Sequence, residues 1–276
     1  MGGRPRNEAE LRALIDRVPM EGAPEALRTQ FAELAGVQPK ARSIERGGVE
    51  CLAVGEGPEI VWFHGGGYVF GAPETHVLLA ETLAAAGLRV ILPRYRLAPE
   101  APWPAMLEDA LAVVAASGDV VLGGDSAGGH LALNVALRRS VLGLALVAPN
   151  TDRSGRSTTR ARTSDAMNDD AGDAELARMA MPGIAPDHTD ASPLLADLSG
   201  LPPLHLEAAS TEILLDDSLM LAAGAARASV ETHLHVTRGL FHMFPLWPDA
   251  LPEGKAALGR LARFAADLHA RAGNAG

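Results

Sequence analysis

The residues with the clearest chemical potential are 124–128, GDSAG, which form a G-x-S-x-G pattern. An apolar run, DVVLG, precedes this pattern, and a helical pattern extends over 127–138. A strand, a sharp turn and a helix in this order hold a serine on a strained turn with its hydroxyl exposed. Ser126 is therefore a candidate nucleophile, and the N-terminus of the helix behind it favours developing negative charge. The alternative is a glycine-rich loop in which Ser126 only caps the helix.

A second glycine-rich turn, HGGG at 64–67, follows the apolar run EIVWF. Three successive glycines leave backbone N–H groups unobstructed, which is what binding of an oxyanion needs. Together with the N–H of Ala127, this turn could hold the oxygen of a tetrahedral intermediate. A merely flexible turn is the alternative, but two such patterns at two strand ends of one chain favour the functional interpretation.

A serine hydroxyl needs a base that accepts its proton. The chain has nine histidines, and most of them lie in strand-like or helical runs, where a structural role is the simpler interpretation. His242 lies instead in the loop RGLFHMF at 238–244, between the last strand-like run and the last helical pattern. In folds that hold a serine on a strand-to-helix turn, the base comes from such a late loop. His242 is therefore the candidate base.

An acid must orient that histidine and stabilise its protonated form. The candidates follow the run PLHLEAA, in the segment STEILLDDS at 210–218. Glu212 comes first, where a loop would leave the strand. Asp216 and Asp217 fall inside the following helical pattern, where acids are favoured by the helix dipole alone. Glu212 is the first candidate and Asp216 the second, and the order serine, acid, histidine along the chain is that of an α/β-hydrolase.

Short apolar runs alternate with helical patterns from about residue 41 onward. The runs are 49–54, 59–63, 89–92, 120–122, 141–147, 204–206 and 232–236, and the helical patterns are 75–86, 104–116, 127–138, 213–228 and 255–272. Such alternation indicates an α/β fold, a mostly parallel central sheet with helices on both faces.

Two segments stand outside this alternation. Residues 1–36 have the apolar spacing of two helices, and residues 151–200 are rich in Ser, Thr, Asp, Arg and Gly. Insertions of this length in compact domains are usually functional or disordered. We expect an α/β-hydrolase core of residues 41–150 and 201–276, with a small helical cap formed by N-terminal helices within 1–40 and by the insertion 151–200.

Three separated motifs, HGGGYVFG at 64–71, YRLAPE at 95–100 and GDSAGG at 124–129, resemble those of the hormone-sensitive-lipase family of microbial esterases. The resemblance covers about residues 50–270 and includes the order of the motifs. The acid motif of that family is D-P-L-x-D-[DE], and EILLDD at 212–217 occupies its place here. Glu212 thus matches the catalytic Asp of the family.

The resemblance implies a serine carboxylesterase that hydrolyses short- to medium-chain esters of small molecules through an acyl-enzyme, without a cofactor or a metal. It implies Gly66 and Gly67, with Ala127, as oxyanion donors, and a possible homodimer. The substrate pocket is expected beside Tyr68, Phe70 and Phe241. Two alternatives stay open: an amide hydrolase of the arylformamidase type with the same triad, and a non-catalytic small-molecule receptor on this scaffold.

Composition excludes several other classes of protein. The chain has 24 Lys+Arg against 34 Asp+Glu, a net charge of −10, which argues against nucleic acid or an anionic membrane as a partner. The single cysteine, Cys51, excludes an intrachain disulfide and a multi-cysteine zinc site. No G-x-G-x-x-G or P-loop pattern signals a nucleotide. Without a signal peptide or an apolar stretch of membrane-spanning length, the expectation is a cytoplasmic protein.

Overall fold

The computed structural model describes residues 4–37 and 41–274. At its centre is a sheet of eight strands in the order β1-β2-β4-β3-β5-β6-β7-β8. The strands are β1 (Arg42–Arg46), β2 (Val49–Val54), β3 (Glu59–Phe63), β4 (Arg89–Pro93), β5 (Val121–Asp125), β6 (Gly143–Val147), β7 (Leu204–Ala209) and β8 (Thr232–Thr237). β2 pairs antiparallel with β1 and β4, and all pairs from β4 to β8 are parallel. The predicted mostly parallel sheet is confirmed.

The central strands explain why the sequence shows apolar runs rather than alternation. Every residue of β5, β6 and β7 is buried, because helices cover both faces of the sheet there. β1 was not expected from the sequence. Its residues, RSIER, are exposed or partly buried, so the strand lacks an apolar signature and follows from backbone pairing with β2 across the turn Gly47-Gly48. Both glycines have positive φ, 58° and 80°, as a tight hairpin turn requires.

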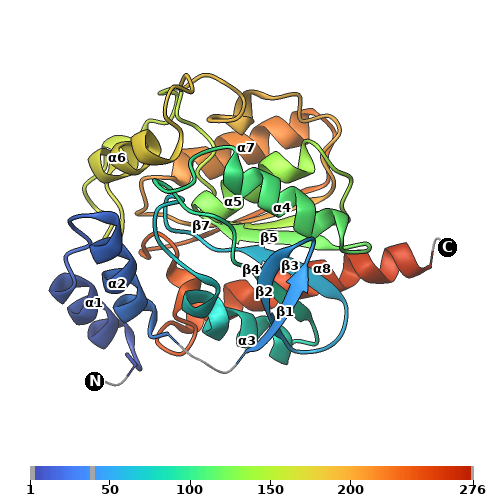
Figure 1. The fold of residues 1–276 in the computed structure, drawn as a ribbon, viewed down its shortest axis with the longest axis horizontal. Helices are drawn as coiled ribbons and strands as arrows, with labels where there is room; N and C mark the ends of the chain where they lie inside the picture. Colours follow the sequence, from blue (N-terminus) through green and yellow to red (C-terminus); the bar gives the residue numbers. More distant parts are fainter. Residues whose placement is uncertain (1–3, 38–40, 275–276) are drawn as a thin grey trace.

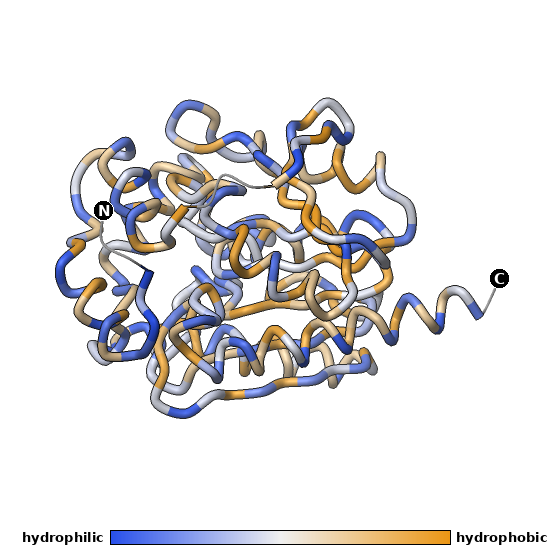
Figure 2. Tube along the Cα trace, turned by 90° about the horizontal axis from the view of Figure 1, so that it is seen from below, coloured by the Kyte–Doolittle hydropathy of each residue, from blue (hydrophilic) through white to orange (hydrophobic). Residues whose placement is uncertain are grey.

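Two helical layers enclose the sheet (Figure 1). One face is covered by α3 (Val77–Ala85) and α8 (Pro252–Gly273), and the other by α4 (Ala105–Ala115), α5 (Ala127–Ala136) and α7 (Leu215–Arg227). Each layer has its own apolar cluster against the sheet. Along α8, apolar and polar residues alternate as in an amphipathic helix that packs on one side only (Figure 2).

Three further helices gather at one end of the molecule: α1 (Glu8–Arg17), α2 (Pro24–Ala35) and α6 (Asp170–Ala180) (Figure 1). α1 begins after Asn7, whose side chain accepts the Glu10 N–H, and α6 begins after Asp169, whose side chain accepts the Gly172 N–H. The predicted division into a cap (1–40 and 151–200) and a core stays a prediction. Of its residues, 1–3, 38–40 and 275–276 lie outside the described part of the chain.

α2 is fastened to the core by Arg28. Its guanidinium donates to the carbonyl oxygens of Val69 (2.9 Å) and Ala98 (3.0 Å) and pairs with Glu100 (2.6 Å). The YRLAPE segment therefore supports one of the N-terminal helices.

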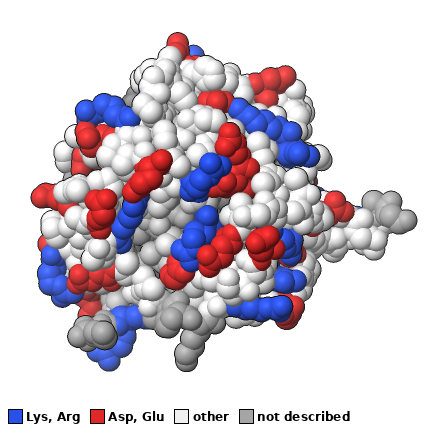
Figure 3. Space-filling view, in the orientation of Figure 1, with Lys and Arg blue, Asp and Glu red and all other residues white. Residues whose placement is uncertain are grey.

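Surface charge and helix composition concern two kinds of possible partner, nucleic acid and membranes. Basic and acidic side chains are interspersed on the face shown in Figure 3. Within residues 4–37 and 41–274, no helix is long and apolar enough to cross a bilayer.

Candidate active site

Ser126 lies on a strained turn between β5 and α5. Its backbone has φ 53° and ψ −119°, a conformation that costs a non-glycine residue about 1–3 kcal/mol and is typical of functional sites. The neighbouring glycines make the turn possible, because a Cβ on Gly124 would lie 2.4 Å from the Gly128 carbonyl oxygen. A Cβ on Gly128 would lie 1.9 Å from the Phe63 carbonyl oxygen, on β3. The sequence therefore folds here into the sharp strand-to-helix turn expected from G-x-S-x-G.

Glu212 and His242 come together from two loops at the carboxyl ends of neighbouring strands. Glu212 follows β7 and His242 follows β8, and His242 Nδ1 lies 2.9 Å from Glu212 Oε2. The second Glu212 oxygen, Oε1, accepts the Ala209 N–H at 2.8 Å. Both side chains are buried. A ring nitrogen bonded to a carboxylate is held as the N–H donor, which leaves Nε2 as the proton acceptor.

Burial and charge act in opposite directions on this pair. Burial lowers the pKa of His242, but the hydrogen bond and the charge of Glu212 raise it more, so that the net change is upward. Burial raises the pKa of Glu212, and the bond from His242 limits that rise. The arrangement stabilises the protonated imidazole that a general base becomes during a reaction.

The other acids of the segment have different partners. Asp216 Oδ2 accepts the N–H groups of Thr158 and Thr159, at 2.7 and 3.2 Å. Asp217 Oδ2 accepts those of Thr151 and Asp152, both at 2.8 Å. Both acids tie the insertion to the first turn of α7, whereas Glu212 is the one hydrogen-bonded to His242.

The triple-glycine turn lies against both the turn that carries Ser126 and the insertion. Gly66 and Gly67 have φ of 119° and 58°. A Cβ on Gly67 would lie 2.5 Å from Leu176 Cδ1 of α6, so glycine is required by the close approach as well as by the backbone. Within the described part of the chain, the amides of Gly66 and Gly67 donate no hydrogen bond to protein. They border the same cavity as Ser126 and His242, with N–H groups available to a ligand.

Asp125, just before Ser126, joins the triple-glycine turn to the turn that carries Ser126. Its carboxylate accepts the Gly65 N–H at 3.0 Å and the Trp62 indole N–H at 2.8 Å, and it lies 3.2 Å from His76 Nε2. The sequence showed Asp125 only as the variable residue of G-x-S-x-G. The burial of Asp125, which the sequence does not show, would have indicated this role, since a buried carboxylate must have several hydrogen-bond donors.

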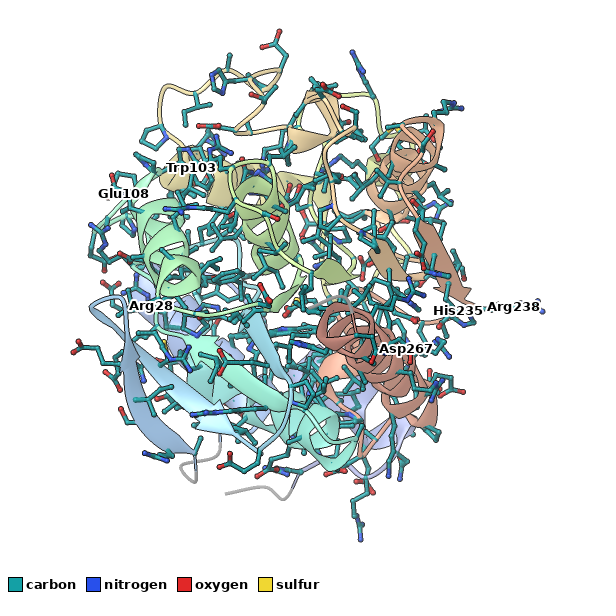
Figure 4. The ribbon with its side chains drawn as sticks, turned by 90° about the vertical axis from the view of Figure 1, so that its right-hand side faces the viewer. Arg28, Trp103, Glu108, His235, Arg238 and Asp267 are labelled. Atoms are coloured by element: carbon teal, nitrogen blue, oxygen red, sulfur yellow. The ribbon has the colours of Figure 1, made fainter. Side chains whose placement is uncertain are left out.

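Two other histidines near the site are neutral supports. His64 stacks on Tyr95 at 4.2 Å, and burial, helped by His76, lowers the pKa of His64 to about 3. His130 Nδ1 lies 2.6 Å from the Tyr68 hydroxyl, and burial, helped by Arg153, lowers the pKa of His130 to about 3. His235 is exposed and projects outward from edge strand β8 (Figure 4).

A cavity of about 410 Å³ is bordered by Ser126 and His242. Most of its apolar wall comes from the N-terminal segment and the insertion, the two segments expected from the sequence to form the cap. The apolar residues with long side chains on that wall are Met20, Leu27, Phe31, Phe70, Met167, Leu176, Met179 and Met243. Four of these are methionines, which adapt their shape to a ligand. Four acidic residues, Glu21, Asp169, Asp173 and Glu175, are also among its lining residues, and of the described residues no Lys or Arg is.

Two residues expected at the pocket lie elsewhere. Of the described residues that border the cavity, neither Tyr68 nor Phe241 is one, whereas Phe70 is. Tyr68 is buried under the turn, where its hydroxyl meets His130. Phe241 is buried against Trp247, with Arg12 over its ring. The expectation was wrong for both residues. Tyr68 adjoins Gly67 and Phe241 adjoins His242 in the sequence, but both side chains point into the core.

A larger cavity, of about 670 Å³, borders other residues of α6, including Ala174 and Ala177. Neither Ser126 nor His242 is among its described lining residues. Size alone would favour it, but the smaller cavity holds the groups that can perform chemistry. In the described ranges no group of His, Cys, Asp or Glu could hold a metal ion.

Fold and site together define an α/β-hydrolase, and comparison with known proteins agrees. A family model described as alpha/beta hydrolase fold matches residues 60–246. An acetyl-hydrolase of Streptomyces hygroscopicus is 34% identical over 219 residues, which are 74% of this chain and 73% of that protein. An esterase of Acinetobacter venetianus is 32% identical over 272 residues, 89% of this chain and 90% of that protein.

A solved structure points to the narrower family. An esterase of the bacterial hormone-sensitive lipase family superimposes with a TM-score of 0.87 at 29% identity, covering 93% of this chain and 96% of that one. The chain belongs to the α/β-hydrolase family and, within it, to the hormone-sensitive-lipase esterases. The fold and the family expected from the three motifs are confirmed.

Proposed function

We propose that the protein hydrolyses carboxylic esters of small molecules through an acyl-enzyme on Ser126, with His242 as the base and Glu212 as the acid. The observation that carries the proposal is the buried hydrogen bond between His242 and Glu212 beside the cavity that Ser126 borders. Relatives named acetyl-hydrolase, esterase and carboxylesterase support it.

In the first step the Ser126 hydroxyl attacks the ester carbonyl carbon while Nε2 of His242 accepts its proton. Glu212 keeps Nδ1 protonated and stabilises the imidazolium. The carbonyl oxygen becomes an oxyanion that accepts hydrogen bonds from the amides of Gly66, Gly67 and Ala127. The start of α5 adds a favourable dipole. His242 then returns the proton to the alcohol as the ester bond breaks.

In the second step a water molecule attacks the acyl group on Ser126, and His242 accepts a proton from it. The same amides stabilise the second oxyanion. Ser126 leaves with the proton returned by His242, and the carboxylic acid is released. No group beyond this chain and water enters either step, so we propose that no cofactor takes part.

The cavity favours a particular kind of ester. Its volume of about 410 Å³ lies toward the lower end of the ~300–1,000 Å³ typical of small-molecule sites, which suits short- to medium-chain esters. Its apolar wall favours an alkyl or aryl group. Glu21 and Asp169 are exposed acids at its border, and no described lining residue is a Lys or Arg, so the site offers an anionic ester no cation to pair with.

An amide hydrolase or a receptor is less favoured, because relatives of this chain are named esterase and carboxylesterase. We further propose that the segments 1–40 and 151–200 act as the cap over this site. A cytoplasmic location and a homodimer stay predictions.

The test is hydrolysis of p-nitrophenyl butyrate by Ser126→Ala. We expect kcat to fall on the order of 10⁴-fold or more, since His242 and Glu212 then have no serine hydroxyl to activate and no acyl-enzyme can form. Ser199→Ala, an exposed serine in the insertion, should match the wild type. A fluorophosphonate probe should label the wild type and Ser199→Ala but not Ser126→Ala. Equal hydrolysis by Ser126→Ala would overturn the assignment.

A further inference from the structure

One side chain of the insertion reaches the loops that carry both Glu212 and His242. Asp165 Oδ1 accepts the backbone N–H of His242 at 3.1 Å, and Oδ2 accepts that of Ile213, the residue after Glu212, also at 3.1 Å. These partners lie 77 and 48 residues away along the chain. A single carboxylate thus bridges the two loops whose relative position sets the bond between Glu212 and His242.

The local backbone shows why both amides are available to Asp165. α7 begins at Leu215, two residues later than the helical pattern predicts, so the Ile213 N–H lies outside the helix. His242 lies after β8 and before the short 3-10 helix Phe244–Leu246, where no strand partner takes its N–H. Asp165 itself is held by a turn in which Oδ1 also accepts the Met167 N–H at 3.1 Å.

A second link between the two loops shows what Asp165 adds. Thr211 Oγ1 donates to the Leu240 carbonyl oxygen, so the loops are already joined one residue before Glu212 and two before His242. That link is neutral and makes no hydrogen bond to the backbone of His242 itself. Asp165 accepts hydrogen bonds from the residue after Glu212 and from His242 itself, and its carboxylate carries a negative charge.

We propose, building on the function proposed above, that Asp165 is a positioning residue of the catalytic centre, which holds the backbone of His242 in place relative to Glu212. The insertion would then complete the catalytic apparatus as well as cover the cavity. Asp165 touches neither substrate nor reacting atoms and acts only through His242 and Glu212.

The charged groups that face His242 come from three elements. They are Glu212 from the loop after β7, Asp165 from the insertion, and Asp125 at the end of β5. All three are acids that raise the pKa of His242, against the opposite effect of burial. Removing the charge of Asp165 should therefore lower the pKa of His242, and the base should stay active at lower pH.

The experiment compares Asp165→Asn with the wild type on p-nitrophenyl butyrate. We expect kcat to fall roughly tenfold to 100-fold, as for a small misplacement of a catalytic group, with KM nearly unchanged. The acid limb of kcat/KM should move to lower pH, the direction expected when a neighbouring negative charge is removed. A purely structural role would reduce the amount of active enzyme without moving that limb.

Two variants serve as controls. Asp197→Asn changes another carboxylate of the insertion, which accepts the Ser199 N–H at 2.9 Å, and it should leave kcat and the limb unchanged. Asp165→Glu keeps the charge, so its limb should stay near that of the wild type even if kcat falls. Active sites are counted by fluorophosphonate labelling, and kcat is calculated per labelled site, so that partly unfolded protein does not lower its value.

The outcomes separate the two proposals. If Asp165→Asn matches the wild type in kcat and in the acid limb, Asp165 is no positioning residue. The same holds if kcat falls while the limb stays in place, or if Asp165→Glu moves the limb as Asp165→Asn does. If the wild type itself neither hydrolyses the ester nor takes up the probe, the proposed function fails instead.

Discussion

Glu212 and His242 lie 30 residues apart in the sequence, and their side chains meet in a buried hydrogen bond of 2.9 Å. Replacing Glu212 by Gln keeps its shape but removes the charge that holds the tautomer and stabilises the imidazolium. We expect kcat to fall on the order of 10³- to 10⁴-fold in ester hydrolysis, with little change in KM. Asp216→Asn is the matched control, because Asp216 bonds to Thr158 and Thr159. A large loss with Asp216→Asn and none with Glu212→Gln would exchange the two roles.

The pH dependence of kcat/KM should report His242. A general base works only when neutral, so activity should rise with pH through the pKa of His242, which lies above its ordinary value of 6.5. His64 and His130, with pKa values of about 3, do not titrate in that range. A profile measured from acid to mildly alkaline pH checks this, and His235→Gln, on the exposed edge strand, should leave it unchanged. An acid limb well below the ordinary histidine value would contradict the assignment.

Gly67 faces α6 so closely that a methyl group cannot fit. Gly67→Ala would place Cβ 2.5 Å from Leu176 Cδ1 and 2.9 Å from Leu176 Cβ, so the turn or the helix must move. Displacing one oxyanion donor costs about 10²- to 10³-fold in kcat, and we expect a loss approaching that range. Adding Leu176→Ala should recover part of the activity.

The control for this prediction is Gly87→Ala. Gly87 also has a positive φ, 95°, which strains an alanine at least as much as the φ of 58° at Gly67, but no atom lies within 4 Å of a new Cβ, so the contact is absent. Its activity should equal that of the wild type. If Gly67→Ala is fully active, the turn does not bind the oxyanion as proposed.

Asp173 fastens α6 to the core. Its buried carboxylate accepts the Asn150 side-chain N–H at 2.7 Å and pairs with Arg153 at 2.9 Å and Arg160 at 2.8 Å. Asp173→Asn would leave two nearly buried guanidinium groups without this partner. We expect the free energy of unfolding to fall by roughly 3 kcal/mol or more, and KM to rise because α6 borders the cavity.

The stability effect of Asp173 should depend on pH. Burial raises the pKa of Asp173, but Arg153 and Arg160 lower it more, so the net change is downward. A carboxyl with a depressed pKa contributes stability above its unfolded pKa and loses it as pH falls through its folded pKa. The gap between wild type and Asp173→Asn in denaturant unfolding should therefore narrow in acid. Asp170→Asn, on the exposed side of α6, should change stability little, and an equal loss there would contradict the role of Asp173.

Much of the site could be predicted because its signals are local. The turn around Ser126 depends on glycines two residues away on either side, and the loop after β7 begins within a few residues of Glu212. Parallel strands bring their carboxyl ends to one edge of the sheet, so the order of the motifs along the chain already predicted that Ser126, Glu212 and His242 converge.

Other features depend on contacts between distant segments, and no pattern in the sequence encodes them. The sequence indicated that the N-terminal segment and the insertion form a cap, but which side chains of residues 20–31 and 167–179 border the cavity is set by the packing of α2 and α6. Tyr68 and Phe241 turn into the core because buried partners are available there.

The sequence by itself determined the kind of chemistry, because a nucleophile, a base, an acid and glycine amides must be present as residue types at fixed places around strand ends. Only the tertiary structure decided that Glu212 is the acid bonded to His242, that Asp165 bridges their loops, and which side chains border the cavity. The physical reason is that these choices depend on distances of a few ångströms between segments dozens of residues apart, which packing sets.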